Sequence, residues 1–393
     1  MVKVKVENLV KIFGGDTKLA MELLNKGFSK DEILKKTSCS LAVANASFEV
    51  REGEVLVIMG LSGSGKSTVV RCLNRLINST SGSVLIDNKN IMDVGLKELL
   101  QIRRKKFSMV FQRFGLLPHK TVLKNVQFGL EIQGVKETIR KSKAMEALNL
   151  VGLENYADSY PSQLSGGMQQ RVGLARALAT DPDMLLMDEA FSALDPLIRR
   201  QMQDELLALQ DKVNKTIIFI THDLDEAIKL GDRIILMKDG RIVQEGTAED
   251  ILTNPVNEYV EKFVEHVDVS KVITAQAVMK PISSLAFVKD GPHTVLHKMK
   301  EHGISTIFVV DRKIHIKGVI TAEDADYLIK NNIKDISSRI QGAQTVELDM
   351  PLSEVLQVMH TAKFPLAVVD DEGKALGIIV RGAVIAGLVN KTA

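Results

Sequence analysis

The chain has 393 residues, with 51 Lys and Arg against 49 Asp and Glu and a formal net charge of +2. Hydrophobic residues make up 45% and charged residues 25%, which excludes an intrinsically disordered chain, because such chains combine low hydrophobicity with high net charge. The near-neutral balance and the 4% of aromatic residues also argue against a nucleic-acid-binding protein, which needs a basic face or aromatic side chains for base stacking. The length predicts two or three domains.

The N-terminal residues 1–7 alternate between apolar and charged types, a pattern typical of a strand and not of a signal peptide. No apolar run approaches the ~20 residues needed to span a bilayer. The two cysteines, Cys39 and Cys72, are too few for a disulfide framework or a cysteine zinc site. We therefore expect a chain without membrane spans in a reducing compartment.

Residues 16–38 form a long connection, which we expect to be a short helical hairpin. Within this connection, Ser29 and Glu32 have the spacing of a capping box immediately before Ile33.

Strand-like apolar runs then alternate with helical stretches, which predicts an α/β domain with a largely parallel core sheet. Asp239-Gly240 follows the last run and predicts a hairpin turn that closes this domain, because glycine adopts positive φ at low cost. A charged helix is expected from Asn254-Pro255 to near His266. The four runs are Val55–Met59, Met184–Met187, Thr216–Thr221 and Ile234–Met237.

From about residue 269 the sequence contains a repeat. Ile307–Asp311 resembles Leu366–Asp370, and Gly318–Ile320 resembles Gly377–Ile379 at the same offset. Two packed copies of a βαββα unit explain this pattern, and the alternative is chance similarity of two apolar strands. The amphipathic helices expected before the repeated strands are Thr294–Glu301 and Leu352–His360.

Gly60–Thr68 fits the pattern G-x-x-x-x-G-K-[ST], and it lies between a predicted strand and a helical stretch at Thr68–Leu76. Its glycines let backbone N–H groups turn toward phosphate oxygens, and a helix N-terminus adds partial positive charge. Lys66 is expected to reach the β- and γ-phosphates, and Ser67 to bind Mg²⁺. The alternative, a Gly/Ser-rich turn with a chance lysine, is disfavoured by the flanking elements.

Asp188 and Glu189 end the apolar run that begins at Met184. Because adjacent side chains on a strand point to opposite sides, the two acids can have different roles. Asp188 fits a Mg²⁺-binding acid, and Glu189 is placed to polarise an attacking water. Solvated acids at a strand end are common, so the assignment of these roles depends on the upstream phosphate-binding pattern.

Ser165-Gly166-Gly167 opens a predicted helix, Met168–Ala179, and provides a second anion-binding helix start. With these motifs in order, residues 2–264 resemble an ATP-binding cassette (ABC) ATPase. The matching motifs are Walker A (Gly60–Thr68), the Q-loop (Gln112), the signature (Leu164–Gln169), Walker B (Leu185–Glu189), the D-loop (Ser192–Asp195) and the H-loop (His222).

The resemblance implies an α/β P-loop NTPase cassette with a helical signature subdomain. It also implies a head-to-tail homodimer that hydrolyses ATP with Mg²⁺ between Walker A of one chain and the signature of the other. The implied site residues are Glu189, His222 and Gln112 for catalysis; Ser67, Gln112 and Asp188 for the metal; Phe13, Gly60, Ser62, Gly63, Ser64, Gly65, Lys66, Ser67 and Thr68 for ATP; and Ser165, Gly166, Gly167 and Asp195 for the ATP of the partner chain.

Two positions depart from the family pattern. Met168 replaces the glutamine that is common in the signature, and Phe13 stands where a tyrosine often stacks on adenine. Phe13 can stack on the base or be a core residue. His222, taken alone, can be a strand-end histidine with a local hydrogen bond.

Three features resemble the ATPase subunit of an osmoprotectant importer for quaternary amines. They are the long connection at residues 16–38, the sequence of residues 188–196 and the C-terminal repeat. The expected cargo is glycine betaine, with carnitine, choline or proline betaine as alternatives. The expected partners are integral-membrane permease subunits, with a linked or separate substrate-binding domain, whose coupling helix contacts Phe111–Pro118. The expected location is peripheral, on the cytoplasmic side of the plasma membrane, with no nucleic acid bound.

Two rival functions are weaker. A cassette ATPase acting on nucleic acid or ribosomes usually has two cassettes or a long coiled-coil insertion, which this chain lacks. A non-enzymatic nucleotide sensor with an inert cassette is disfavoured by the intact Lys66, Asp188, Glu189 and His222.

The repeat resembles a tandem CBS-domain pair, which gives predicted domains 1–268, 269–330 and 331–393. The ribose- and phosphate-contacting pattern of CBS domains is present at Gly318–Asp324, whereas Val380 and Ala383 replace its hydroxyl and acid in the second copy. Thr321 and Asp324 can therefore contact a ligand, cap a helix, or do both. The expected ligand is an adenine nucleotide or cyclic di-AMP, the latter across a two-fold axis.

Two basic clusters allow two interpretations: each is a solvated face of the protein or a contact with anionic lipid headgroups. The clusters are Arg103-Arg104-Lys105-Lys106 and Lys136, Arg140, Lys141 and Lys143.

Overall fold

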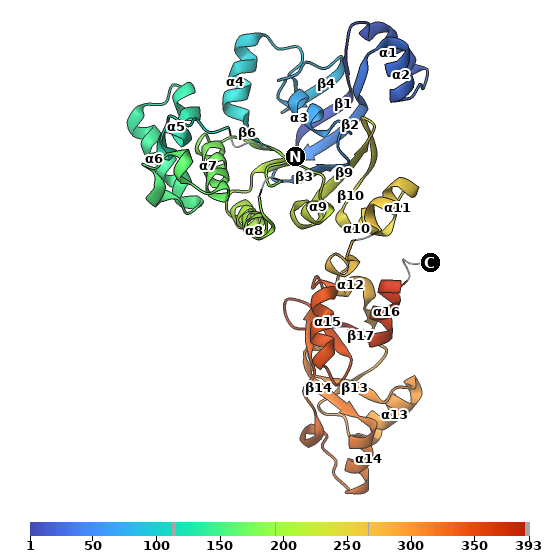
Figure 1. Ribbon diagram of the computed structural model, residues 1–393. Helices are drawn as coiled ribbons and strands as arrows, with labels where there is room; N and C mark the ends of the chain where they lie inside the picture. The colour runs from blue at the N-terminus through green and yellow to red at the C-terminus, as the bar shows by residue number, and fades with distance from the viewer. Residues whose placement is uncertain (112–114, 193, 266, 390–393) are drawn as a thin grey trace. The chain divides into compact units, whose positions relative to one another are not determined.

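The structure is a computed structural model that describes residues 1–111, 115–192, 194–265 and 267–389. It divides into two compact units, Met1–Val267 and Asp268–Ala393, and each is described by itself (Figure 1). In the described residues, no helix has the length and apolar character needed to cross a membrane.

The first unit contains a six-stranded sheet with the order β10-β9-β3-β8-β7-β6. All neighbouring strands are parallel except β9 and β10, which form the hairpin predicted at Asp239-Gly240. The predicted parallel α/β core is therefore confirmed. The strands are β3 (Val55–Met59), β6 (Phe107–Phe111), β7 (Met184–Asp188), β8 (Thr216–Thr221), β9 (Arg233–Lys238) and β10 (Arg241–Gly246).

A second, antiparallel sheet has the order β2-β1-β4-β5. Helix α3 (Lys66–Leu73) packs between the two sheets, since its apolar side chains share one core with residues of β1, β3 and β8. Every residue of β3, β7 and β8 is buried, as expected for central parallel strands. The antiparallel strands are β1 (Val2–Phe13), β2 (Ser40–Arg51), β4 (Ser81–Ile86) and β5 (Lys89–Asn90).

The predicted hairpin at residues 16–38 is confirmed as helices α1 (Thr17–Asn25) and α2 (Lys30–Thr37). The capping box is present, because the Ser29 hydroxyl accepts from the Glu32 amide and the Glu32 carboxylate accepts from the Ser29 amide. The hairpin buries its own apolar residues against β1 and β2, which makes it a folded addition to the second sheet.

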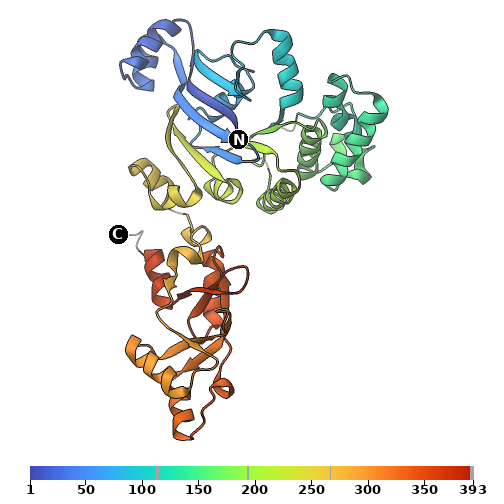
Figure 2. The ribbon, with the colours of Figure 1, turned by 180° about the vertical axis from the view of Figure 1, so that it is seen from behind.

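Helices α5 (Val122–Ile132), α6 (Glu137–Leu150) and α7 (Gly166–Ala179) pack on one another and form a helical subdomain. In both ribbon views this subdomain and the α1–α2 hairpin lie at opposite ends of the first unit (Figures 1 and 2). The remaining helices of the unit are α4 (Leu96–Lys106), α8 (Pro196–Val213), α9 (Leu224–Leu230), α10 (Ala248–Thr253) and α11 (Glu258–Val264).

Two local expectations are wrong. The helix expected from Asn254-Pro255 begins at Glu258, because Asn257 accepts from the amides of Tyr259 and Val260 and caps α11. The hairpin at residues 239–240 does not close the unit, since α10 and α11 follow it.

Part of the first basic cluster is neither a solvated face nor a lipid surface. Arg103 donates to the carbonyl oxygens of Asn74 and Arg75, and the Lys106 ammonium pairs with Asp87 at 2.9 Å and Asp183 at 2.6 Å. Arg103 thus connects α4 to the segment that follows α3, and Lys106 connects it to acids beside β4 and β7.

The second unit consists of two copies of the predicted βαββα repeat, so chance similarity is excluded. In each copy the first strand pairs parallel with the second, and the second pairs antiparallel with the third. The first copy is β12 (Leu285–Phe287), α13 (Pro292–His302), β13 (Thr306–Val310), β14 (Ile316–Thr321) and α14 (Ala322–Lys330); the second is β15 (Thr345–Glu347), α15 (Leu352–Thr361), β16 (Leu366–Val369), β17 (Ala375–Ile379) and α16 (Arg381–Val389).

The two copies share an apolar contact in which Phe308 and Val319 of the first pack against Ala367 of the second. The entering segment, α12 (Ala275–Val278) and β11 (Lys280–Pro281), joins the second copy, because β11 pairs with β17. The unit therefore has one interlocked architecture.

Candidate nucleotide-binding site

The phosphate loop, the acids Asp188 and Glu189, and His222 meet at the carboxyl ends of three neighbouring strands. Strand β3 pairs with β8, so that Met59 lies opposite Thr221, and β7 pairs with β8, so that Asp188 lies opposite Ile220. The connections that leave these strands therefore begin side by side. This edge is where open parallel sheets bind their ligands.

The phosphate loop (Gly60–Thr68) requires glycine at its two ends. Gly60 has φ +145° and Gly65 has φ +101°, and a Cβ at either position would lie 2.2 Å from a backbone carbonyl oxygen, that of Met237 or that of Ala42. Only glycine allows this close approach of the loop to β9 and β2. Ser62 and Gly63 are exposed, Thr68 is half-buried, and Ser64 is buried.

Lys66 is 5% exposed, and its ammonium donates to the carbonyl oxygens of Gly60 at 2.8 Å and Leu61 at 3.1 Å. Burial lowers the pKa of Lys66, while the nearby charges of Glu189 and Asp188 oppose that shift. The helix expected at Thr68–Leu76 begins two residues earlier, at Lys66, with Gly65 as its N-cap. The side chain of Lys66 therefore points into the loop from the first turn of α3.

Ser67 joins the phosphate loop to β7. Its hydroxyl donates to Oδ1 of Asp188 at 2.8 Å, and the guanidinium of Arg71, one turn further along α3, lies 3.5 Å from Oδ2. Asp188 is 6% exposed. A hydroxyl and a carboxylate are hard oxygen ligands of the kind that Mg²⁺ prefers, so the pair fits the metal role expected from the sequence.

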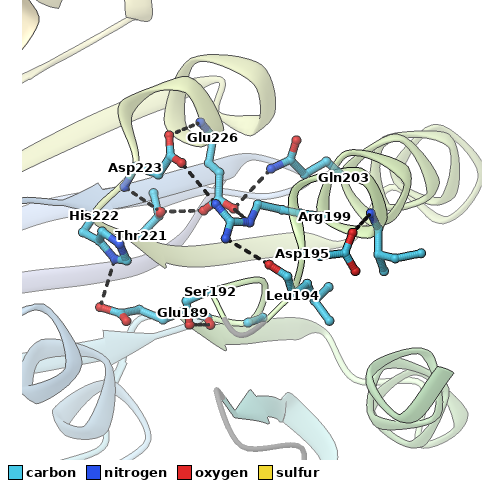
Figure 3. Close-up of polar contacts among 12 residues, drawn as sticks. Glu189, Ser192, Leu194, Asp195, Arg199, Gln203, Thr221, His222, Asp223 and Glu226 are labelled. Atoms are coloured by element: carbon cyan, nitrogen blue, oxygen red, sulfur yellow. Dashed lines mark hydrogen bonds and ion pairs between the residues drawn. The ribbon is translucent and has the colours of Figure 1, made fainter. Parts of the chain in front are cut away.

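Glu189 does not continue the strand, which ends at Asp188. Its backbone is left-handed, with φ +47°, and its amide donates to the carbonyl oxygen of Ile220. The expectation that strand alternation separates the two acids is therefore wrong; this turn sets the direction of Glu189. Its carboxylate oxygen lies 3.7 Å from Nδ1 of His222, which follows β8 (Figure 3).

The signature segment (Leu164–Gln169) lies at the N-terminus of α7, which begins at Gly166 and not at the predicted Met168. Ser165 is the N-cap, and its hydroxyl accepts from the Met168 amide at 3.3 Å. A Cβ at Gly167 would lie 2.6 Å from the Ile198 side chain on α8. Asp195 caps α8 by accepting from the amides of Leu197 and Ile198. Gly167 therefore packs closely against α8, the helix that Asp195 caps.

Phe13 ends β1 and is 41% exposed, with the Lys11 ammonium 4.7 Å from the ring centroid. The core interpretation of Phe13 is therefore wrong. Gln112 lies outside the described residues.

Sequence reasoning missed two contacts with the site. The ammonium of Lys30, at the start of α2, donates to the Gly63 carbonyl at 3.0 Å, and nothing in the sequence marks this contact between separate segments. Arg71 was predictable, because it lies four residues after Ser67 and so shares its helix face.

Residues 43–192 match the ABC transporter family model, and residues 276–330 and 333–390 match the CBS domain model. The glycine betaine/carnitine transport ATP-binding protein GbuA of Listeria monocytogenes is 56% identical over 389 residues, 99% of this chain and 98% of its own length. This chain belongs to the ABC transporter family. It is an ABC-type ATPase with a C-terminal CBS pair, as the sequence predicts.

Two further comparisons agree with this assignment of the ABC ATPase. The glycine betaine/proline betaine transport ATP-binding protein ProV of Escherichia coli is 47% identical over 98% of this chain and 98% of its own length. A solved dimeric post-hydrolysis state of the ATP-binding cassette MJ0796, bound to ADP and Pi, matches with a TM-score of 0.53 and 36% identity, covering 62% of this chain and 98% of that one.

Proposed function

We propose that this ABC ATPase energises the import of glycine betaine or a related quaternary amine through a separate membrane permease. The observation that carries the catalytic part is the pair of contacts at one sheet edge, Ser67 with Asp188 and Glu189 with His222. The cargo rests on the names of the relatives, which specify glycine betaine with carnitine for GbuA and with proline betaine for ProV. Choline remains an alternative cargo.

The residues fit ATP and Mg²⁺. Only glycine fits at positions 60 and 65 of the loop, because a Cβ there would collide with a backbone carbonyl oxygen. The Ser64 hydroxyl is buried without a hydrogen-bond partner in the described chain. The Lys66 ammonium and the amides at the start of α3 would hold phosphate oxygens. Ser67 and Asp188, with Gln112, would hold Mg²⁺, which neutralises phosphate charge when bound.

Glu189 and His222 would carry the chemistry. The Glu189 carboxylate orients the attacking water and accepts its proton. His222 lies on the same side, within 3.7 Å of that carboxylate, so it can donate to a γ-phosphate oxygen while it fixes the direction of Glu189.

Ser165, Gly166, Gly167 and Asp195 would act on the ATP of a second chain. The related cassette MJ0796 is dimeric in its solved structure, which supports a homodimer. Two composite sites then close when the cassettes associate. Phe13 would stack on adenine, since its ring is exposed.

The permease would dock at a hollow of about 520 Å³ between α4, β6, α5 and α7. Its apolar and basic lining suits a short amphipathic helix of the partner, and it includes Phe111 and Gly115 of the segment in which the family resemblance predicts this contact. Docking there would hold the ATPase at the cytoplasmic face of the membrane. The apolar lining includes Phe107, Met109, Phe111, Phe128 and Ile132, and the basic lining includes Arg103 and Arg104.

The cargo proposal is tested with this chain reconstituted in liposomes with its permease. We expect glycine betaine to raise ATP hydrolysis several-fold and proline, which lacks a quaternary nitrogen, to have no effect. Stimulation by choline alone would reassign the cargo, and stimulation by no quaternary amine would contradict the importer function.

We infer that the CBS unit regulates the ATPase through an adenine nucleotide. Thr321 caps α14, and its hydroxyl and the Gln341 amide both donate to Oδ2 of Asp324 at 2.7 Å. Burial alone would raise the pKa of Asp324, but these hydrogen bonds and the charge of Arg339 lower it. The capping role of Thr321 is therefore present, and a ligand that binds the charged Asp324 would compete with Thr321, Gln341 and Arg339 for its carboxylate.

Because the second copy has Val380 and Ala383 at these positions, each chain offers one such hydroxyl and acid pair. A ligand with two-fold symmetry, such as cyclic di-AMP, would make the same contacts with both chains of a homodimer. Calorimetry with the full chain should show one cyclic di-AMP per two chains, and the Asp324→Asn variant should bind it more weakly. One AMP or ATP per chain, without binding of cyclic di-AMP, would contradict this symmetry.

A further inference from the structure

A buried polar cluster connects helices α8 and α9 beside the proposed catalytic residues (Figure 3). Thr221, Gln203 and Glu226 are 2%, 5% and 5% exposed. The Glu226 carboxylate accepts from the Thr221 hydroxyl at 2.5 Å and from the Gln203 amide at 3.2 Å. Two side chains, one from β8 and one from α8, are thereby fixed to one carboxylate on α9.

Arg199 on α8 extends this cluster to the D-loop. Its Nη2 donates to the Leu194 carbonyl at 3.1 Å, its Nη1 lies 3.5 Å from Oδ2 of Asp223, and its Nε lies 3.9 Å from Oε1 of Glu226. This Nε is buried and makes no hydrogen bond to any described residue. The Arg199 side chain is 27% exposed, and its guanidinium lies between two carboxylates, so the loss of the Glu226 charge would weaken its position without leaving it unpaired.

The cluster holds both neighbours of His222. Thr221 donates to Glu226, and the Asp223 amide donates to the Thr221 hydroxyl at 2.9 Å, while the Asp223 carboxylate caps α9 and faces Arg199. Since the peptide on each side of His222 is fixed, the direction of its ring is restricted. The same guanidinium holds the carbonyl of Leu194, the residue immediately before Asp195.

We propose that Arg199 and Glu226 are positioning residues that hold His222 in a fixed relation to the Leu194–Asp195 segment. The inference rests on the proposed ATP hydrolysis, in which His222 contacts the γ-phosphate and Asp195 faces the partner chain. Arg199 and Glu226 are not among the residues assigned to the nucleotide or the metal, and their effect would pass through the backbone of the two loops. Weakening the pair should therefore lower kcat and leave ATP affinity unchanged.

The chain provides a matched control. Lys229 on α9 pairs with Asp204 on α8 at 2.6 Å, so it connects the same two helices. That pair is more exposed than Arg199 and Glu226, and both of its residues lie outside the motifs of the site. Asp204→Asn and Glu226→Gln therefore remove the same kind of charge from the same helix pair, and Gln retains the shape and one oxygen of Glu226.

With the purified full-length chain, Glu226→Gln and Arg199→Lys should each lower kcat about tenfold or more, while KM and the Kd for a fluorescent ATP analogue stay within about twofold. Asp204→Asn should leave kcat and KM within about twofold of wild type. In a His222→Ala background, Glu226→Gln should cause little further loss, because both changes remove the same function.

Unchanged kcat in both variants, or losses that add fully to that of His222→Ala, would overturn the inference. If Glu226→Gln does not fold, Arg199→Lys decides by the same measurements. Absence of ATP hydrolysis by the wild-type chain, alone and with its permease, would instead contradict the proposed function, so the two failures are distinguishable.

Discussion

Glu189→Gln is expected to reduce kcat for ATP hydrolysis by about 10²–10⁴-fold, the usual contribution of a general base. The amide retains the size of the side chain but cannot accept a proton from water. Lys66, Ser67 and Asp188 are unchanged, so the Kd for ATP should remain close to that of wild type. The variant should accumulate as an ATP-bound dimer, which gel filtration with and without ATP would detect.

A suitable control is Glu249→Gln, because Glu249 is an exposed acid on α10, outside the described contacts of the site. It should leave both kcat and the dimer population unchanged. Near-normal hydrolysis by Glu189→Gln in the complex with the permease would exclude Glu189 as the general base.

Lys66→Ala is expected to weaken ATP binding itself. Hydrogen bonds to charged groups contribute about 1.5–3 kcal/mol, so the Kd for ATP should rise about 10–150-fold when the ammonium is lost. Lys66→Arg tests geometry at constant charge: at 5% exposure the larger guanidinium does not fit the space of the ammonium, and affinity should fall as well.

The measurement is equilibrium titration with a fluorescent ATP analogue, and thermal unfolding without nucleotide is the control for folding. A Kd within about twofold of wild type for Lys66→Ala would exclude Lys66 as a phosphate ligand.

The sequence predicts the strands that carry the site to within a residue. Val55–Met59 and Thr216–Thr221 are continuous apolar runs bounded by charged or polar residues, and such runs have one stable environment, the centre of a parallel sheet. The phosphate loop was equally predictable from the spacing of its glycines. The structure explains that spacing, because a Cβ at either end of the loop would collide with a backbone carbonyl oxygen.

Other features could not be predicted, because they depend on tertiary contacts. The left-handed backbone of Glu189 is fixed by its hydrogen bond to β8, and no local propensity of glutamate indicates it. Lys30 and Gly63 come from separate segments, and Arg199 and Glu226 from separate helices. The helix starts were misplaced for a different reason: Gly166 and Gly167 have low helix propensity, yet the Ser165 cap and the packing on Ile198 hold them in α7.

The position of β3 between β8 and β9 has a consequence for synthesis on the ribosome. Val55 pairs with Ile217, and the strand that carries the phosphate loop has no parallel neighbour until β8 has been translated. At about 5–20 residues per second, that interval lasts on the order of 10 to 30 s. During this time an apolar segment that becomes fully buried has no partner strand, and ATP cannot stabilise it. Nascent chains of this ATPase are therefore expected to need chaperone protection until β8 emerges.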